Sequence, residues 1–237
     1  MASSSLMMQY SMGSVAATTT DIIRLQEWVP TILLKRRASW GYLTRIFEGG
    51  RVFYNTALVT EQDIRQIWTE ERLQKRTQRF FTLGTALGGI LDIPSAHDFA
   101  RAISHITLDY ESLVAADVKS KSLFSLKGSE ETAEYDHLEI HTIPFNIDYL
   151  ITLASLCDAI FQVYDKLLTH HKKDQMWQAT TLDSFQKADT RFKKVMGTIY
   201  RDLEALARDI MTEELNSVDP LGGLFSLSAT QDDDSEI

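Results

Sequence analysis

The chain has 237 residues, a formal net charge of −9, 44% hydrophobic residues and a single cysteine. One cysteine excludes a disulfide framework and a cysteine-based zinc module, and apolar content this high excludes a wholly disordered chain. The best candidate for a membrane span, residues 80–91, is shorter than the ~20 residues that such a helix needs. The sequence therefore predicts a soluble protein without a transmembrane segment.

Charge is divided unevenly along the chain. Residues 21–90 hold eleven Lys and Arg against seven Asp and Glu, whereas residues 91–237 hold thirteen against twenty-six. The two parts therefore attract each other. Mutual neutralisation within one fold is a simpler explanation than display of the basic part to an anionic partner.

The two ends of the chain lack the pattern of a folded domain. Residues 1–20 carry no charge and are rich in Ser, Thr and Met, which is typical of neither a secretion signal nor a mitochondrial presequence, so we expect a disordered leader. Residues 218–237 bury too little apolar surface to offset the entropy of ordering, and we expect a flexible acidic tail. Residues 21–217 are expected to form one helical domain. The lone thiol and the absence of a targeting signal predict a cytoplasmic location, with the nucleus as the second choice.

Helical periodicity runs through almost every apolar segment between the termini, which predicts an all-α fold. A first helix is expected over residues 21–47, where Pro30 either kinks the helix or marks its true start. A second helix opens at Thr60, with Asp63 in the capping-box position. It continues through an arginine-rich middle into the uncharged residues 80–91, where a glycine pair permits either close helix packing or a break.

The third helix is expected to start at its Ser95 cap and to run to about Lys119 with a single apolar face. The following stretch, residues 120–143, loses the helical period and is assigned to a long exposed loop. A fourth helix over residues 144–170 is almost wholly apolar. It should lie at the centre of the bundle and bury Cys157.

The fifth helix, residues 182–215, carries an apolar seam at spacings of three and four residues, which is typical of bundle or coiled-coil packing. The seam consists of Phe185, Ala188, Phe192, Val195, Ile199, Leu203, Leu206 and Ile210. The expected architecture is an elongated bundle of about five helices with disordered ends.

No motif in the sequence predicts an enzyme. The sequence contains no phosphate-binding loop, no dinucleotide-binding glycine turn, no nucleophile elbow and no Glu-x-x-His pair for a di-iron site. His137 and His141 would share one helix face, as a metal site requires, but they fall in or beside the long loop, and we interpret them as solvated. We therefore expect no metal and no cofactor. The rival hypothesis is a metal-dependent helical-bundle enzyme that uses these two histidines together with His97 and His105.

The strongest candidate binding surface is an arginine stripe on the second helix, with spacings of seven, four and three residues. It consists of Arg65, Arg72, Arg76 and Arg79. Guanidinium groups on one face bind phosphates of lipids or nucleic acid, or carboxylates of a partner protein. Nucleic acid is the least favoured partner, because the stripe has no interleaved aromatic residues and the chain is acidic. The simplest alternative is a solvated face with internal ion pairs.

Two kinds of short motif lie in the predicted arms and helices. The tetrapeptide Leu-Phe-Ser-Leu occurs once in the loop and once in the tail, in segments of the kind that partner proteins usually recognise. Its apolar anchors are Leu123, Phe124, Leu126, Leu224, Phe225 and Leu227. Ser39 follows two arginines in a pattern that resembles protein kinase A substrates, although chance is the simpler explanation inside a helix. Thr230 precedes an acidic run and resembles sites of acidophilic or glutamine-directed kinases, and phosphorylation there would switch the charge of the tail.

These features predict a non-enzymatic adaptor or scaffold subunit of a eukaryotic cell, which binds other proteins through helical faces and flexible arms within a complex. The leading alternative is a peripheral membrane-trafficking factor whose arginine stripe binds anionic lipid. The second alternative is the metal-dependent enzyme described above.

Overall fold

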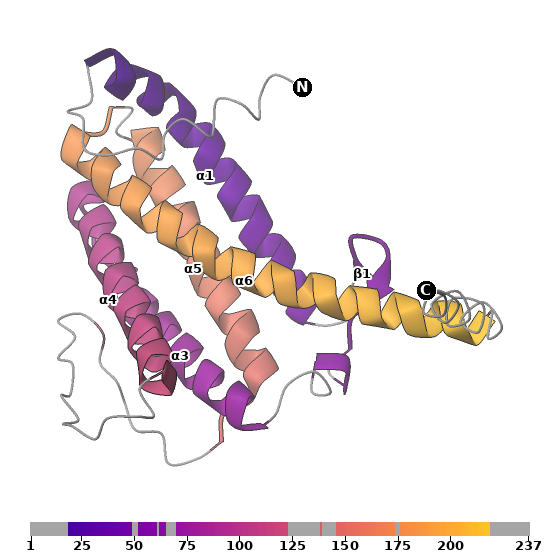
Figure 1. Cartoon of the computed structure of the whole chain (residues 1–237). Helices are drawn as coiled ribbons and strands as arrows, with labels where there is room; N and C mark the ends of the chain where they lie inside the picture. Colours follow the sequence, from indigo (N-terminus) through magenta and orange to yellow (C-terminus); the bar gives the residue numbers. More distant parts are fainter. Residues whose placement is uncertain are drawn as a thin grey trace, which may run out of the picture.

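The computed structural model describes residues 19–48, 52–60, 62–64, 70–122, 138, 146–173 and 176–218. Five long helices account for most of these residues and form an elongated bundle (Figure 1). They are α1 (Thr19–Phe47), α3 (Glu70–Gly89), α4 (Ala96–Ser122), α5 (Tyr149–Lys173) and α6 (Ala179–Val218). The predicted all-α bundle is confirmed. A search of the described helices finds none with the length and hydropathy of a membrane span.

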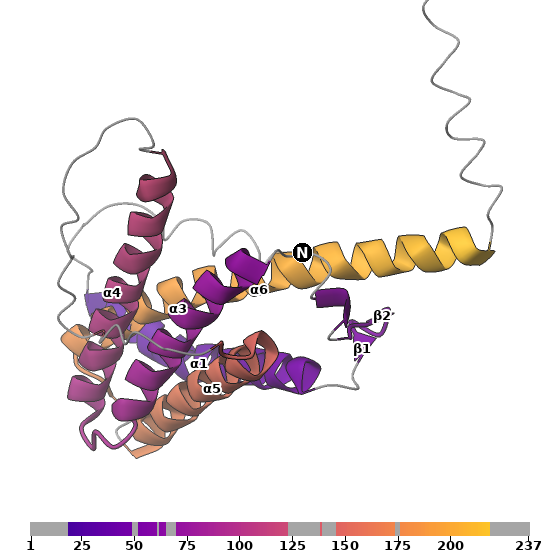
Figure 2. The same ribbon diagram turned by 90° about the horizontal axis from the view of Figure 1, so that it is seen from below.

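The apolar helix α5 lies at the centre of the bundle. α1 packs along one side of α5 and α3 along another, while α4 packs mainly against α6 (Figures 1 and 2). Glycine permits one of these approaches, and a second glycine lies at ordinary contact distance from its neighbour. A Cβ atom added to Gly41 of α1 would lie 3.1 Å from the ring of Phe161, and one added to Gly84 of α3 would lie 3.9 Å from the Cα atom of Leu156. Gly84 therefore lies in close helix packing and not in a break.

Capping side chains decide where the helices begin. The backbone N–H of Ile151 donates to Asp148 Oδ1 at 2.9 Å, so α5 begins at Tyr149 and not at residue 144 as expected. The predicted Ser95 cap is confirmed, since its hydroxyl accepts a bond from the backbone N–H of Asp98 at 3.3 Å. Pro30 lies inside α1, which runs through it.

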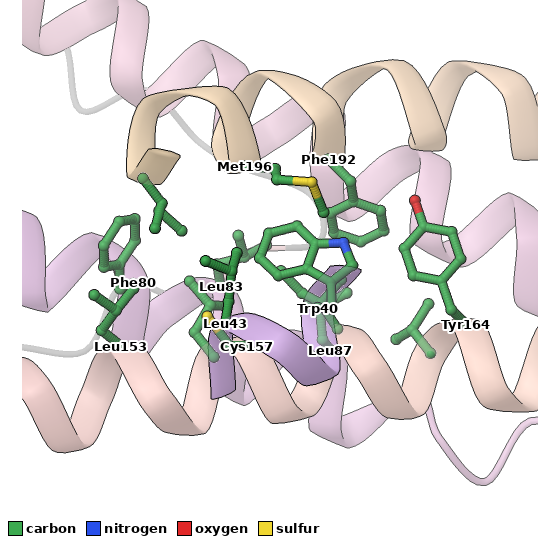
Figure 3. Packing of buried hydrophobic residues seen from close by; sticks show 14 of the residues in the cluster. Trp40, Leu43, Phe80, Leu83, Leu87, Leu153, Cys157, Tyr164, Phe192 and Met196 are labelled. Atoms are coloured by element: carbon green, nitrogen blue, oxygen red, sulfur yellow. The ribbon is translucent and has the colours of Figure 1, made fainter. Parts of the chain in front are cut away.

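The core is one continuous cluster of buried side chains from all five helices (Figure 3). The indole of Trp40 is fully buried and meets the ring of Phe192 edge to face, with 6.5 Å between centroids. Phe192 also contacts Tyr164, with 5.8 Å between centroids. Cys157 is fully buried, and burial raises the pKa of its thiol far above the ordinary value. The prediction that Cys157 lies in the core is confirmed.

A buried carboxylate, Asp189, joins three helices. It accepts bonds from Arg36 Nε of α1 and from the Tyr164 hydroxyl of α5, each at 2.8 Å, and Lys193 Nζ lies 3.2 Å away. Burial raises the pKa of Tyr164 well above its usual value, and the neighbouring Asp189 adds to the increase. The Tyr164 phenol therefore stays protonated at neutral pH and remains a hydrogen-bond donor to Asp189.

A small hairpin between α1 and α3 was not expected from the sequence. Strand β1 (Val52–Phe53) pairs antiparallel with β2 (Ala57–Leu58). Tyr54 and Asn55 have positive φ angles of 47° and 57°, as a type I′ turn requires. The ring of Tyr54 stacks on Tyr200 of α6 with 6.2 Å between centroids, so the hairpin is fixed against α6.

Helix α6 is 40 residues long, or ~60 Å, and its predicted seam faces the core. The helix extends beyond the rest of the bundle (Figure 2). On the final turns the apolar residues are exposed, with Met211 at 42%, Leu215 at 67% and Val218 at 83%. These three residues, spaced by four and three, form a short apolar stripe on a different face of α6 from the buried seam, and no other described element covers it.

Candidate functional site

Two arginines of the predicted stripe, Arg76 and Arg79, line a groove of about 400 Å³ between α3, α4 and α6, which we call the basic groove. The structure does not test the full stripe, because Arg65 and the side chain of Arg72 lie outside the described part of the chain. The cationic side chains of the groove are Arg76, Arg79, Arg191 and Lys194. Its apolar wall consists of Phe80, Leu83, Val114, Ala115, Phe192 and Val195.

On one wall of the basic groove, Glu111 of α4 holds two cations of α6. Arg191 Nε donates to Glu111 Oε2 at 3.2 Å, and Lys194 Nζ donates to Glu111 Oε1. The bond from Lys194 contributes most to keeping the pKa of Glu111 below its ordinary value, and the bond from Arg191 adds to this effect. Arg191 Nη1 also donates to the Ser104 carbonyl at 3.2 Å. The two cations are therefore positioned by α4 before any ligand arrives.

On the opposite wall, the α3 arginines are also anchored. Arg76 Nη2 lies 2.6 Å from Asp202 Oδ2 of α6, and the guanidinium carbon of Arg76 lies 5.1 Å from the ring centroid of Phe80. Arg79 Nε donates to the Lys75 carbonyl at 3.3 Å. Arg76 is therefore ion-paired, but its partner lies on α6 and its side chain is largely buried, which differs from the solvated face with internal ion pairs given as the alternative.

A tyrosine hydroxyl lies among these charges. Burial raises the pKa of Tyr110 to about 12, although the positive charges of Arg79 and Arg76 oppose that increase. The phenol therefore stays protonated at neutral pH and offers both a donor and an acceptor inside the basic groove.

Cationic side chains outnumber carboxylates among the described lining residues of the basic groove. Four cations and one carboxylate line it, and Asp202, which lies outside the lining, pairs with Arg76. These cations surround an apolar wall. Such a surface favours a ligand that carries an anionic group next to an apolar one, because the anionic group can bind the cations while the apolar group packs against the wall.

Sequence reasoning missed Glu111, Arg191 and Lys194. Arg191 and Lys194 lie next to the seam residues Phe192 and Val195 in the sequence. This adjacency could have predicted that both cations lie at the edge of the buried face. No spacing within one helix shows that α3 and α6 place their cations around the same groove. The proximity of these cations depends on the tertiary structure.

The kinase-like pattern at Ser39 lies in the middle of α1. The Ser39 hydroxyl donates to the Lys35 carbonyl at 3.0 Å, Arg36 pairs with Asp189, and Arg37 Nε lies 2.8 Å from Asp165 Oδ1. Both arginines of the pattern therefore contact a carboxylate on a neighbouring helix. Phosphorylation of Ser39 stays a prediction.

The rival hypothesis of a metal-dependent enzyme requires a cluster of metal ligands. Among the described residues, no group of three His, Cys, Asp or Glu side chains lies close enough together to hold a metal ion. His97 Nδ1 lies 3.4 Å from its neighbour Asp98, and His105 is exposed on α4. His137, His141, Thr230 and both copies of Leu-Phe-Ser-Leu lie outside the described residues. No protein-family model, curated protein or solved structure gives a significant match to the chain.

Proposed function

We propose that the chain is a non-enzymatic adaptor that holds an acidic, partly apolar segment of a partner protein in the basic groove. The observation behind the proposal is that four cations and one carboxylate lie around one apolar wall among the described lining residues. Charge-assisted bonds to carboxylates are stronger than neutral hydrogen bonds, and the apolar wall adds burial.

The shape of the site favours a protein segment over a membrane. The cations line a groove between three helices, and Arg76 is held against Asp202 and the Phe80 ring. A flat bilayer needs cations on a protruding face, whereas an inserted peptide reaches cations inside a groove. Anionic lipid remains the alternative partner, because phosphate also binds guanidinium groups.

The exposed end of α6 supports the same function. Met211, Leu215 and Val218 present an apolar stripe without a neighbour among the described elements. Such a stripe at heptad-like spacing is the usual contact surface of a partner helix. The proposed cytoplasmic location and the use of the Leu-Phe-Ser-Leu arms as peptide ligands belong to this adaptor model.

The test is zero-length carbodiimide cross-linking in native cells, which joins a lysine amine to a carboxylate in direct contact with it. We expect Lys194, which also contacts its own Glu111, to give in addition to that intramolecular product a cross-link to an acidic segment of a partner protein, identified by mass spectrometry. The double variant Arg79→Glu with Lys194→Glu should weaken binding of that purified segment at least tenfold, or about 1.4 kcal/mol. Lys187→Glu is the matched control, because this exposed lysine of α6 pairs with Asp183 outside the groove.

Two results would contradict the adaptor proposal. One is a partner whose affinity is the same for the wild-type chain and the groove double variant. The other is flotation of the chain with vesicles of phosphatidylserine and phosphatidylcholine, abolished by the double variant, without any protein cross-link at the groove. The second result would transfer the function to the membrane alternative.

A further inference from the structure

A second groove, with the opposite charge, runs along α5 on another part of the molecule. Its volume is about 740 Å³, within the ~300–1,000 Å³ range of ligand clefts. The end of α1, the segment around Val59 and the end of α3 form its sides. We call it the acidic groove. It shares no lining residue with the basic groove.

The floor of the acidic groove contains an apolar side chain that the fold leaves open. Ile151 of α5 is 69% exposed, although α5 is the central helix of the core. Ser155, Asp158 and Gln162 follow it at spacings of four, three and four on the same face. Small residues such as Ala154 and Gly88 line the groove beside this face, and a Cβ atom added to Gly88 would meet nothing within 4 Å. The groove is therefore open to a helix that approaches closely.

The charge of this groove selects its ligand. Glu48, Asp148 and Asp158 line it, and its described lining residues include no lysine or arginine. Asp158 accepts a bond from the neutral amide of Gln162 at 2.6 Å, which leaves its negative charge in place. Asp148 also caps α5, where the positive helix terminus offsets part of its charge. Glu48 and Asp158 therefore supply most of the attraction for a cation.

We propose that the acidic groove binds a basic amphipathic helix of a partner protein. The α5 face from Asp148 to Gln162 is about 21 Å long, which matches about four turns of helix. Apolar residues of the ligand at spacings of three and four would cover Ile151 and the small residues, and Lys or Arg at the edges would meet Glu48 and Asp158. This inference does not depend on the function proposed for the basic groove.

The test is selection of a display library of random 16-residue peptides against the full chain. We expect enriched peptides to carry net positive charge with apolar residues at helical spacing. Their affinity should fall at least tenfold when Ile151→Ser removes the apolar floor, and also when Glu48→Lys and Asp158→Lys are combined. The control is Glu213→Lys with Glu214→Lys on the exposed end of α6, which makes the same change in net charge outside the groove. All four acidic residues are at the surface or half-buried, and Ile151 is exposed, so the variants should fold.

Four results would overturn the inference. The first is an absence of enriched peptides, and the second is enrichment of acidic or neutral peptides. The third is a set of basic peptides whose affinity is unchanged by both groove variants. If the wild-type chain instead forms a dimer that Ile151→Ser dissociates, the groove is a contact between copies, and the partner helix is excluded.

Discussion

The basic groove and the acidic groove differ in what their apolar residues do for the fold. Two residues in the apolar wall of the basic groove are also core residues, since Phe80 is 4% and Phe192 is 2% exposed. The acidic groove exposes its apolar floor at Ile151, which contributes little to the packing of the bundle. The apolar wall of the basic groove is therefore tied to stability, whereas Ile151 can change without unfolding the protein, although Ile46, Val59 and Ile64 beside it belong to the core.

The largest predicted effect tests this difference in stability. Phe192→Ala removes a ring that contacts Trp40 and Tyr164, so the free energy of unfolding should fall by about 3–5 kcal/mol. Ile151→Ala should change it by less than about 0.5 kcal/mol, because the side chain is exposed. Urea denaturation followed by circular dichroism measures both. Similar losses in the two variants would contradict the division between the grooves.

A glycine substitution probes the openness of the acidic groove. Gly88→Ala should raise the free energy of unfolding by about 0.5 kcal/mol, because the added methyl group meets no atom and the unfolded chain loses freedom. Gly197→Ala in the interior of α6 is the matched control and should raise it by about 1 kcal/mol. Thermal unfolding compares them. A lower melting temperature for Gly88→Ala would show that the groove is filled.

The ion pairs of the basic groove predict a pH effect at Glu111. Because the Lys194 bond lowers the pKa of Glu111 in the folded state, its contribution to stability is present above the ordinary glutamate pKa and is lost as pH falls through the folded-state pKa. Lys194→Met should raise the pKa of Glu111 toward the ordinary value. Arg191→Met should raise it less, since the bond from Arg191 is the weaker contribution. Carbon-13 NMR of the carboxyl group follows the titration, and an unchanged pKa in Lys194→Met would refute the pairing.

The sequence was sufficient for the helices and for the residues that pack between them. The seam of α6 and the burial of Cys157 followed from periodicity, because a helix with an apolar face must bury that face. The hairpin could not be predicted in this way. Its strands have two residues each, too few for an alternating pattern, and only the turn at Tyr54 and Asn55 defines it.

The two grooves contain features that helical periodicity alone could not predict. Thr152 of α5 is buried and its hydroxyl donates to the Asp148 carbonyl at 2.6 Å, whereas the neighbouring Ile151 is 69% exposed. A hydroxyl that bonds to its own helix can be buried, so polarity alone does not show which of the two residues faces the core. The basic groove combines side chains from α3, α4 and α6, whose proximity no local pattern contains.

Methyl NMR with two peptides tests most directly the central claim that the grooves bind ligands of opposite charge. The probes are one amphipathic peptide with glutamates and its counterpart with lysines at the same positions, each titrated into the full chain with labelled Ile and Val methyl groups. The glutamate peptide should shift Val114 and Val195 and leave Ile151 unchanged, and the lysine peptide should do the reverse. Shifts of the same methyl groups by both peptides, or of none by either, would contradict the claim.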